Sequence, residues 1–304
     1  MNKKGLTASF IFEAESGNYG ESVGNVTSLK KLSRGTGDSY TYISRQALRY
    51  NIIEQMGENR TPIDAVGDGN SKVLQFKKEA TIINYPEIDL FGYMKTKDEV
   101  KTRSAIVRLS NAVSLESFNA DIDFLTNKGL LDRYNSQGDE TMGGGNIAQS
   151  EIHKSYYTYT IAIDLDKIGI DENGQDKNGN ILEIMAEEKV NRVNKLLDTI
   201  KFLYRDIKGR RENLSPVFAI GGVYDIKNPF FENRLRIRNN RVVINAIKNV
   251  YNLDSTIVQS TCVGLVKGIF SNDNAIVEEL GAEGIGSFFN SLKDEVEKYY
   301  LGNK

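Results

Sequence analysis

The segment from Leu29 to Tyr50, LKKLSRGTGDSYTYISRQALRY, concentrates side chains that bind anions. Within it one acid, Asp38, stands against five basic residues: Lys30, Lys31, Arg34, Arg45 and Arg49. Ammonium and guanidinium groups pair with carboxylates and phosphates, and a guanidinium group does so through two hydrogen bonds at once. Gly35 and Gly37 allow the main chain to bend close to a ligand. The segment therefore predicts an anion site.

A helix that begins after Ser44 has to position two of these cations. Ser44 is a suitable N-cap, and a rotation of about 100° per residue puts Arg45 and Arg49 on the apolar side of the helix. That side is formed by Leu48, Ile52, Ile53 and Met56. Guanidinium groups there are expected to reach into a cleft, where the helix N-terminus also favours an anion. The alternative is a structural salt bridge beside a solvated loop.

Aromatic residues and segregated charge extend this interpretation to nucleic acid. Tyr40 and Tyr42 alternate with the cations and offer flat rings on which unpaired bases could stack. The net charge is only -2, but residues 201–211 and 227–248 are basic whereas residues 273–297 are acidic. Charge combined with stacking predicts a site for single-stranded nucleic acid, although each basic block could also be a solvated face.

Composition limits the class of protein. A chain of 304 residues with 39% hydrophobic and 26% charged residues can form one large domain or two small ones. No apolar run of about 18 residues occurs and the first residues lack a signal-peptide pattern, so we expect a cytoplasmic protein without membrane contact. With one cysteine, Cys262, and one histidine, His153, a disulfide or a metal site of these residues is not expected. No cofactor and no metal are predicted.

The pattern of hydrophobic residues predicts an α+β fold. Alternating strands are expected near residues 6–12, 105–109, 156–164 and 217–223. Helices are expected from Ser44 to about Met56 and from about Glu183 to Asp206. This order, with a long excursion before the third strand, matches the βαββαβ ferredoxin-like arrangement that RNA-recognition-motif proteins use. No internal repeat is visible, so any periodic structure would arise by self-assembly.

Several sequence blocks resemble one known family. ESGNYGESVGNVTSLKKL followed by YTYISRQALRY is similar to the DevR-type backbone subunit of CRISPR type I Cascade, within the RAMP superfamily. Further similar blocks are INYPEIDLFGYM from Ile83, TYTIAIDLDKIG from Thr158 and FAIGGVYD from Phe218. The resemblance reaches to about residue 270, and the SRQALR and EIDLFGYM blocks in this order are its most specific part.

The resemblance implies a hand-shaped, non-catalytic subunit with an expanded RNA-recognition-motif palm. The palm would comprise about residues 1–57, 99–114 and 151–270, and an acidic region would follow at about 271–304. A fingers insertion is expected at about 58–98 and a thumb hairpin at about 115–150. Copies would polymerise along guide crRNA, contact other Cascade subunits and leave bases free to pair with target DNA.

The same resemblance assigns candidate site residues. It places Ser44, Arg45, Gln46 and Arg49 on guide phosphates, with Lys30, Lys31 and Arg34 lining the same groove. Gly221 and Gly222 would let a strand end approach the RNA backbone, and the alternative for them is a β-bulge. Met142, in the thumb candidate, would wedge between bases, and the alternative is a loop methionine without such a role.

Two other functions remain open at the level of sequence. Related type III subunits cut RNA with an aspartate between the first strand and the first helix, and Asp38 lies in that interval, so it could hold Mg²⁺ beside RNA. The family has also been labelled an autoregulator, which would require DNA binding; residues 234–241 are the one candidate segment, but their spacing suits a strand better than a recognition helix. A structural subunit without nucleic-acid contact is the remaining alternative.

Overall fold

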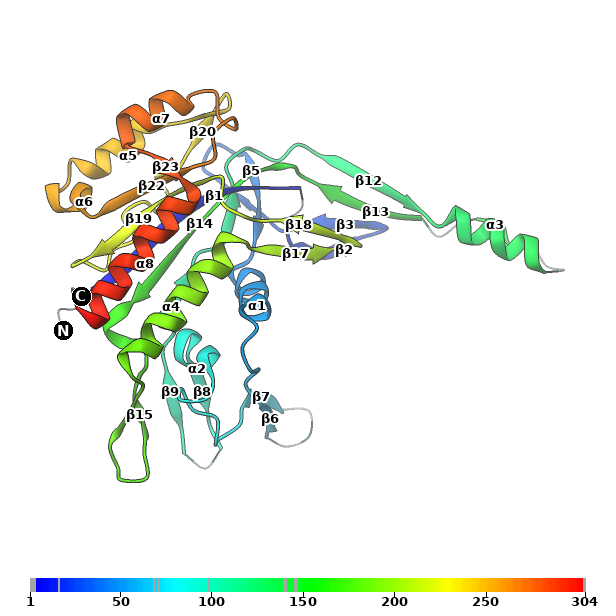
Figure 1. The fold of residues 1–304 in the computed structure, drawn as a ribbon. Helices are drawn as coiled ribbons and strands as arrows, with labels where there is room; N and C mark the ends of the chain where they lie inside the picture. The colour runs from blue at the N-terminus through cyan, green and yellow to red at the C-terminus, as the bar shows by residue number, and fades with distance from the viewer. Residues whose placement is uncertain are drawn as a thin grey trace.

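The computed structural model describes residues 4–15, 17–67, 69, 72–97, 99–138, 141–144 and 147–302. Figure 1 shows a mixed α+β body from which a long arm projects to one side, with short hairpins at the opposite end of the body from a small helical lobe. The α+β class predicted from the sequence is confirmed. Across the described part of the chain, no helix is long and apolar enough to cross a bilayer.

A central sheet organises the body. Its order is β23-β22-β19-β1-β14-β11-β5-β4, and β10 also pairs with β14. The strands are β1 (Gly5–Ala14), β4 (Lys31–Ser33), β5 (Ser39–Ile43), β10 (Val107–Leu109), β11 (Ala112–Ser114), β14 (Ser155–Asp164), β19 (Phe218–Tyr224), β22 (Thr261–Leu265) and β23 (Glu283–Gly284). Strand β1 pairs antiparallel with both β14 and β19. It is therefore the strand from which the others are positioned.

Both faces of β1 are buried. Leu6, Phe10 and Phe12 belong to the larger core, as their alternation predicts, whereas Ile11 belongs to a second core on the other face. The small polar residues that alternate with them are buried as well, and Ser9 Oγ lies 2.6 Å from Thr160 Oγ1. The sequence predicted one apolar face, and the structure adds a second because a helical lobe covers it.

Three helices pack in the larger core: α1 (Arg45–Met56), α4 (Ala186–Lys201) and α8 (Ile285–Leu301). Figure 1 shows α4 and α8 running side by side across the sheet. The predicted helix from Ser44 is confirmed, with Leu48, Ile52 and Met56 buried. The helix predicted from Glu183 to Asp206 is shorter than expected, because the chain turns at Phe202 and forms a strand from Tyr204.

The second core lies under a small lobe. The lobe contains α5 (Ile244–Tyr251), α6 (Ser255–Gln259), α7 (Asp273–Leu280) and the hairpin of β20 (Ile237–Arg238) with β21 (Arg241–Val242). Phe218 and Ile220 of β19 face this lobe, while Ala219 and Val223 face the larger core. The strand therefore joins the two cores.

Below the sheet, short elements form the end of the body opposite the lobe. They are β6 (Ile63–Val66), β7 (Val73–Phe76), α2 (Pro86–Phe91), β8 (Tyr93–Lys95), β9 (Lys101–Arg103), the 3-10 turn Leu165–Lys167, β15 (Ile170–Gln175) and β16 (Ile181–Glu183). Their own apolar cluster is small and is built around Ile82, Ile88 and Tyr93. Such a cluster stabilises little by itself, so these elements depend on their attachment to the body.

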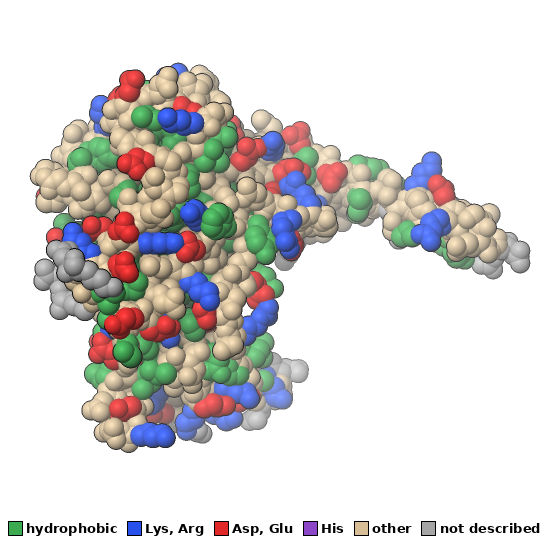
Figure 2. Space-filling view, viewed as in Figure 1, with side chains coloured by type: hydrophobic (Ala, Val, Ile, Leu, Met, Phe, Trp, Pro, Cys, Tyr) green, Lys and Arg blue, Asp and Glu red, His purple; other side chains and the backbone are tan. Residues whose placement is uncertain are grey.

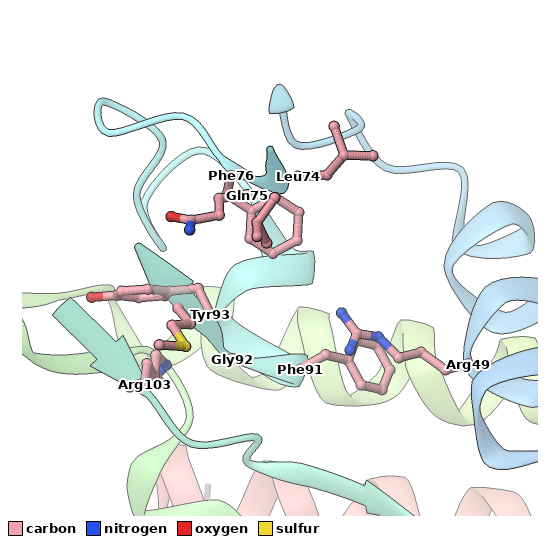
Figure 3. Close-up of a pocket in the computed structure, with 10 residues that line it drawn as sticks. Arg49, Leu74, Gln75, Phe76, Phe91, Gly92, Tyr93 and Arg103 are labelled. Atoms are coloured by element: carbon pink, nitrogen blue, oxygen red, sulfur yellow. The ribbon is translucent and has the colours of Figure 1, made fainter. Parts of the chain in front are cut away.

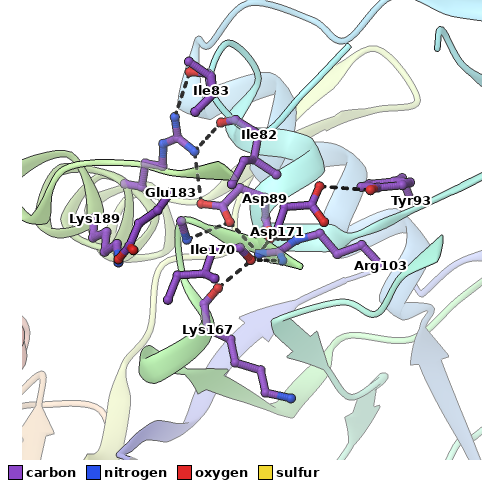
Figure 4. A network of polar contacts seen from close by, with 12 residues as sticks. Ile82, Ile83, Asp89, Tyr93, Arg103, Lys167, Ile170, Asp171, Glu183 and Lys189 are labelled. Carbon is purple, nitrogen blue, oxygen red and sulfur yellow. Dashed lines mark hydrogen bonds and ion pairs between the residues drawn. The ribbon is translucent and has the colours of Figure 1, made fainter. Parts of the chain in front are cut away.

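That attachment is a buried ionic network around Asp89 (Figure 4). The Asp89 carboxylate is fully buried, and it lies 2.7 Å from Arg103 Nη2 and 3.0 Å from Arg192 Nη1. The amide of Gly169 donates to Asp89 Oδ1 at 2.8 Å. Arg192 also donates to the carbonyls of Ile82 at 2.7 Å and Ile83 at 3.2 Å. One carboxylate thus links α2, β9, α4 and the turn before β15.

The arm consists of β12 (Asp121–Thr126), α3 (Lys128–Gln137) and β13 (Ile147–Ile152). At its base, β13 pairs with β3 (Val26–Leu29), which pairs with β2 (Tyr19–Val23). The hairpin of β17 (Tyr204–Ile207) and β18 (Arg210–Asn213) lies beside the base, where Lys208 Nζ hydrogen-bonds Ser150 Oγ. Every residue of β12 is exposed and no residue of α3 is buried. The described residues of β12 and α3 therefore form no core of their own, and Figure 1 shows the arm projecting away from the body.

We expect Asp89→Asn to lower the free energy of unfolding by roughly 3–5 kcal/mol, because it leaves the buried Arg103 without its anion and leaves Arg192 with only the partly exposed Glu188. Thermal or urea unfolding followed by circular dichroism would measure this. The matched control is Asp64→Asn, which removes an exposed carboxylate paired with Lys97 at 3.0 Å and should leave the unfolding midpoint unchanged. Equal midpoints for both variants would contradict the role given to Asp89.

Candidate nucleic-acid interface

A β-hairpin delivers the predicted basic loop to the start of α1. Strands β4 and β5 pair through Lys31↔Thr41 and Ser33↔Ser39. The tip is closed by the Arg34 amide, which donates to the Asp38 carbonyl at 3.0 Å, and by the Gly37 amide, which donates to the Arg34 carbonyl at 2.9 Å. Gly37 has φ of 87°, a conformation that favours glycine. The tip therefore has a defined shape.

The first turn of α1 uses side chains from this chain as caps. Ser44 Oγ accepts from the Ala47 amide at 3.3 Å and from Asn18 Nδ2 at 3.2 Å. The Arg45 amide donates to Asn111 Oδ1 at 2.9 Å. The N-cap predicted at Ser44 is confirmed, but these bonds occupy amides that would otherwise face a ligand. Fewer free amides therefore remain at this helix end to bind the anion that the sequence predicted there.

Of the two arginines of α1, Arg49 is half-buried and reaches into a cleft as predicted, whereas the prediction for Arg45 was wrong. Arg45 and Gln46 are exposed, and the Arg49 side chain is 36% exposed. Residues of a first turn can share the angular position of the core residues and still lie beyond the layer they pack on. Arg49 Nη2 is 3.7 Å from Glu87 Oε1, and its guanidinium lies 4.9 Å from the centre of the Phe91 ring. Arg49 therefore makes the structural contacts named as the alternative.

Three of the predicted cations have no anionic partner among the residues that the structure describes: Lys30, Arg34 and Arg45. All three are exposed. Lys30 and Arg34 lie four residues apart along an extended segment and so point to the same side of it. Arg34 lies at the hairpin tip and Arg45 lies just beyond the far end of β5. At about 3.3 Å per residue along β5, roughly 20 Å separates them. We call these three residues the cationic surface.

Lys31, by contrast, is held by the arm. Its Nζ lies 2.8 Å from both carboxylate oxygens of Glu151 in β13, and 4.4 Å from the centre of the Phe118 ring. Glu151 also accepts from the Leu29 amide at 2.7 Å. The charge of Lys31 is thus neutralised within the chain, and its role in the structure is to fix the base of the arm.

The aromatic rings near this surface are partly used within the chain. The Arg34 guanidinium lies 4.0 Å from the centre of the Tyr40 ring, which covers one face of that ring. Next to Tyr40 on β5, Thr41 Oγ1 lies 2.7 Å from both His153 Nδ1 and Tyr157 Oη. Burial lowers the pKa of His153 from its ordinary value and so favours the neutral ring. These contacts fix β5 to β14 behind the cationic surface.

A cleft of about 490 Å³ opens between α1 and the β6–β7 hairpin (Figure 3). Figure 3 shows Arg49 reaching from α1 across the Phe91 ring into this cleft. Its lining residues are Arg49, Val73, Leu74, Gln75, Phe76, Phe91, Gly92, Tyr93, Met94 and Arg103. A guanidinium group beside aromatic and apolar side chains is an arrangement that can hold a base next to its phosphate.

Gly221 and Gly222 lie inside the central sheet, so neither interpretation offered for them is correct. Both are buried in β19, and the pairings of β19 with β1 and β22 run in regular register without a bulge. A Cβ on Gly221 would stand 2.3 Å from the Thr7 carbonyl oxygen, and one on Gly222 would stand 1.8 Å from that of Ser260. The close approach that these glycines allow is to the chain itself.

Two further candidates lie at exposed tips. Asp38 Oδ2 accepts from Thr36 Oγ1 at 2.9 Å. Within the described ranges, no group of three or more His, Cys, Asp or Glu side chains could hold a metal ion.

Met142, near the far end of the arm, is 56% exposed, and its amide donates to Asn135 Oδ1 of α3 at 2.8 Å.

The basic blocks predicted from the sequence differ in their pairing. In residues 201–211, Arg205 pairs with Glu212 at 2.6 Å in a buried contact, and Arg211 pairs with Asp206 at 2.8 Å. Figure 2 shows cationic and anionic side chains interspersed over the visible face. Most of the positive charge on the β17–β18 hairpin is therefore neutralised by neighbouring carboxylates. The arginines of residues 234–241 differ, because Arg236, Arg238 and Arg241 make no ion pair with the described residues.

Sequence reasoning missed several residues that shape the interface. Asn18 and Asn111 cap α1, and Glu151 holds Lys31 from 120 positions away. None of these has a local sequence signal, because each acts across a tertiary contact. The sequence does carry a signal for the exposed apolar side chains of the arm, because Ile122, Phe124 and Leu125 stand in a polar stretch of the sequence.

Comparison with known proteins identifies the family. A family model described as "CRISPR-associated negative auto-regulator DevR/Csa2" matches residues 6–240. The chain belongs to the DevR/Csa2 family. This DevR/Csa2 member is also 30% identical over 165 residues to a protein of Myxococcus xanthus (strain DK1622) named "CRISPR-associated protein Cas7/Cst2/DevR". The match covers 48% of this chain and about half, 52%, of that relative.

Solved structures share the fold of this DevR/Csa2 protein. One chain from a "CRISPR RNA-guided surveillance complex" is 16% identical with a TM-score of 0.58, covering 98% of this chain and 100% of that one. A second, from a "CRISPR RNA-guided surveillance complex, pre-nicking", is 14% identical with a TM-score of 0.58, covering 98% and 99%. The resemblance recognised in the sequence is confirmed at the level of family and fold.

We expect Gly222→Ala to destabilise the fold by at least about 1–3 kcal/mol, because the new Cβ would have to displace the main chain at Ser260. The control is Gly35→Ala, which meets no atom within 4 Å and should leave the unfolding midpoint unchanged. Thermal unfolding of the two variants would decide the matter. A Gly222→Ala protein of unchanged stability but weaker RNA binding would restore the original role of this glycine.

Proposed function

We propose that this protein is a non-catalytic subunit of a CRISPR RNA-guided complex that binds the phosphates of guide RNA and assembles in several copies along it. The observation that carries this proposal is the cationic surface: Lys30, Arg34 and Arg45 are exposed and lack anionic partners within the described chain. Unpaired cations in a row suit a polyanion. Because phosphates carry no sequence information, bases held this way stay free to pair with target DNA.

We infer that the body is a ferredoxin-like palm. The order β19-β1-β14-β10, with α1 between β1 and β10 and α4 between β14 and β19, supports this inference. The remaining strands of the central sheet extend that core at both edges. On this inference the elements around α2 correspond to the fingers and the arm corresponds to the thumb.

The arm supports assembly of several copies. It exposes large apolar side chains that find no core within the chain: Ile122, Phe124, Leu125, Leu130, Tyr134, Met142 and Ile147. Several large apolar side chains exposed on one projecting element are typical of an interaction site. A neighbouring copy that holds the same RNA would cover this surface, and Met142 near the far end would then be close to the bases.

RNA cleavage is the alternative function to be tested beside this one. It would require Asp38 to hold Mg²⁺ next to a bound phosphate. The position of Asp38 on the same hairpin tip as Arg34 places a carboxylate near the proposed RNA path. A binding test therefore has to score the integrity of the RNA as well as its mobility.

The variant Lys30→Gln with Arg34→Gln and Arg45→Gln should weaken binding of guide-length single-stranded RNA by about tenfold or more and reduce the slope of log affinity against log salt by roughly 2. Filter binding across a salt series measures both. The matched control replaces three exposed cations that have acidic partners, Arg60, Lys154 and Arg211, with Gln. Equal losses in both triple variants would overturn the assignment of the cationic surface.

The same complexes, run on a denaturing gel in Mg²⁺, should contain intact RNA. Shortened RNA that Asp38→Asn restores to full length would favour the cleaving alternative. Salt-resistant or sequence-selective binding would contradict a site for phosphates.

Phe124→Ser with Leu125→Ser should abolish the ladder of multi-copy complexes on guide-length RNA without changing the unfolding midpoint, since both side chains are exposed, at 54% and 67%. Native gels and sedimentation velocity would show this. The control is Ile83→Ser with Val100→Ser, which removes exposed apolar side chains next to α2 and β9, outside the arm. An unchanged ladder in the arm variant would exclude the arm from assembly.

A further inference from the structure

The hairpin of β20 and β21 has one apolar face and one cationic face. Ile237 and Val242 are paired across it and buried in the second core. Arg238 and Arg241 are paired directly opposite each other on the other face, and both are exposed. The Val243 amide donates to the Arg236 carbonyl at 3.0 Å, which extends the ladder and places the exposed Arg236 on the same face as Arg238. We call this set the arginine hairpin.

The turn that closes the hairpin is rigid. Asn239 and Asn240 have φ of 50° and 55°, the conformation of a two-residue turn that matches strand twist. Asn240 is held further, because its carbonyl accepts from the Ser271 amide at 3.0 Å and its Nδ2 donates to the Ile269 carbonyl at 3.1 Å. The two arginines are thus kept side by side by the fold.

Like charges held opposite each other in a sheet destabilise it. Over the ranges that the structure describes, none of Arg236, Arg238 and Arg241 makes an ion pair or a side-chain hydrogen bond. The arginines of the β17–β18 hairpin differ sharply, since Arg211 pairs with Asp206 and Arg210 with Glu15 and Glu212. The arginine hairpin therefore presents concentrated positive charge that an external anion would neutralise.

The chemistry of the set indicates the class of anion. All its cations are arginines, whose planar guanidinium groups bind phosphate through two hydrogen bonds, and they repeat every second residue at about 6.6 Å along a strand. A two-stranded ribbon with such a face fits a run of phosphates better than one isolated anion. Asn239 adds an exposed amide at the tip.

This place is separate from the cationic surface. The hairpin packs in the second core with α5 and α7, whereas α1 packs in the larger core on the other face of the sheet. In Figure 1 the hairpin lies in the lobe on one side of the arm's base and α1 lies on the other side. The hairpin contacts the central sheet at Tyr156 of β14, whose Oη donates to Asn240 Oδ1 at 3.3 Å.

We propose that the arginine hairpin is a second nucleic-acid site, which binds the phosphates of a strand or duplex other than the one on the cationic surface. The proposal does not depend on guide binding. Duplex and single-stranded DNA share the phosphate chemistry, and the test separates them.

The test compares two double variants of the full chain. Arg238→Gln with Arg241→Gln removes the unpaired arginines, and Arg210→Gln with Arg211→Gln removes two arginines from a hairpin where they are paired. Fluorescence anisotropy with labelled duplex DNA and with single-stranded DNA of equal length, over a salt series, gives affinity and salt slope. Guide-length RNA is titrated in parallel.

We expect the Arg238/Arg241 variant to bind one of the two DNA probes about tenfold more weakly, with the salt slope reduced by about 1.8 for duplex or about 1.4 for single-stranded DNA. The probe whose affinity falls more identifies the ligand. The unfolding midpoint of the Arg238/Arg241 variant should stay equal or rise, because the repulsion between two like charges is removed. The Arg210/Arg211 variant should bind both probes as the unmodified protein does.

Three results would overturn the proposal. Equal losses in both double variants would mean general electrostatic attraction. The Arg238/Arg241 variant could instead bind DNA normally but lose the ability to self-associate when no nucleic acid is present. That result would assign the hairpin to an acidic surface of another copy. DNA binding lost only in the Lys30/Arg34/Arg45 variant would place all nucleic acid on the cationic surface, while RNA binding by that surface is judged from its own titration.

Discussion

A carboxylate without exposed surface lies between two guanidinium groups, and it fixes α2 and β9 to the rest of the body. Asp89 brings together α2, β9 and α4, although the local apolar cluster there is small. Buried charge is costly to desolvate, so such a network tolerates little displacement before it becomes strongly unfavourable. The cleft beside Arg49 and Phe91 is held open by this attachment, because Phe91 follows Asp89 on the same short helix.

The body and the arm are stabilised by different interactions. In the body, β1 is buried on both faces and its neighbours follow from its pairing. In the arm, main-chain pairing and one helix persist without burial, so its order comes from the ladder of β12 with β13 and from the base alone. The chain therefore combines a part that is stable by itself with a part whose apolar side chains are satisfied only by contact with something else.

Local signals in the sequence were sufficient for part of this structure. The N-cap at Ser44 and the spacing of Leu48, Ile52 and Met56 predicted α1, and alternation in residues 156–164 predicted β14. The exposure of Arg45 was not predictable, because it depends on where the first turn lies relative to the layer beneath. Gly221 and Gly222 were misread because their close neighbours, Thr7 and Ser260, come from other parts of the chain. Lys31 was counted as free because its partner lies 120 residues away.

The contact between Glu151 and Lys31 has a mechanical consequence. Glu151 belongs to β13 of the arm, and it also holds the Leu29 amide at the end of β3, just before the segment from Lys30 to Arg34. The position of the arm is therefore coupled to that of this segment. In the proposed row of copies along guide RNA, an arm held in this way would set a constant spacing from one copy to the next.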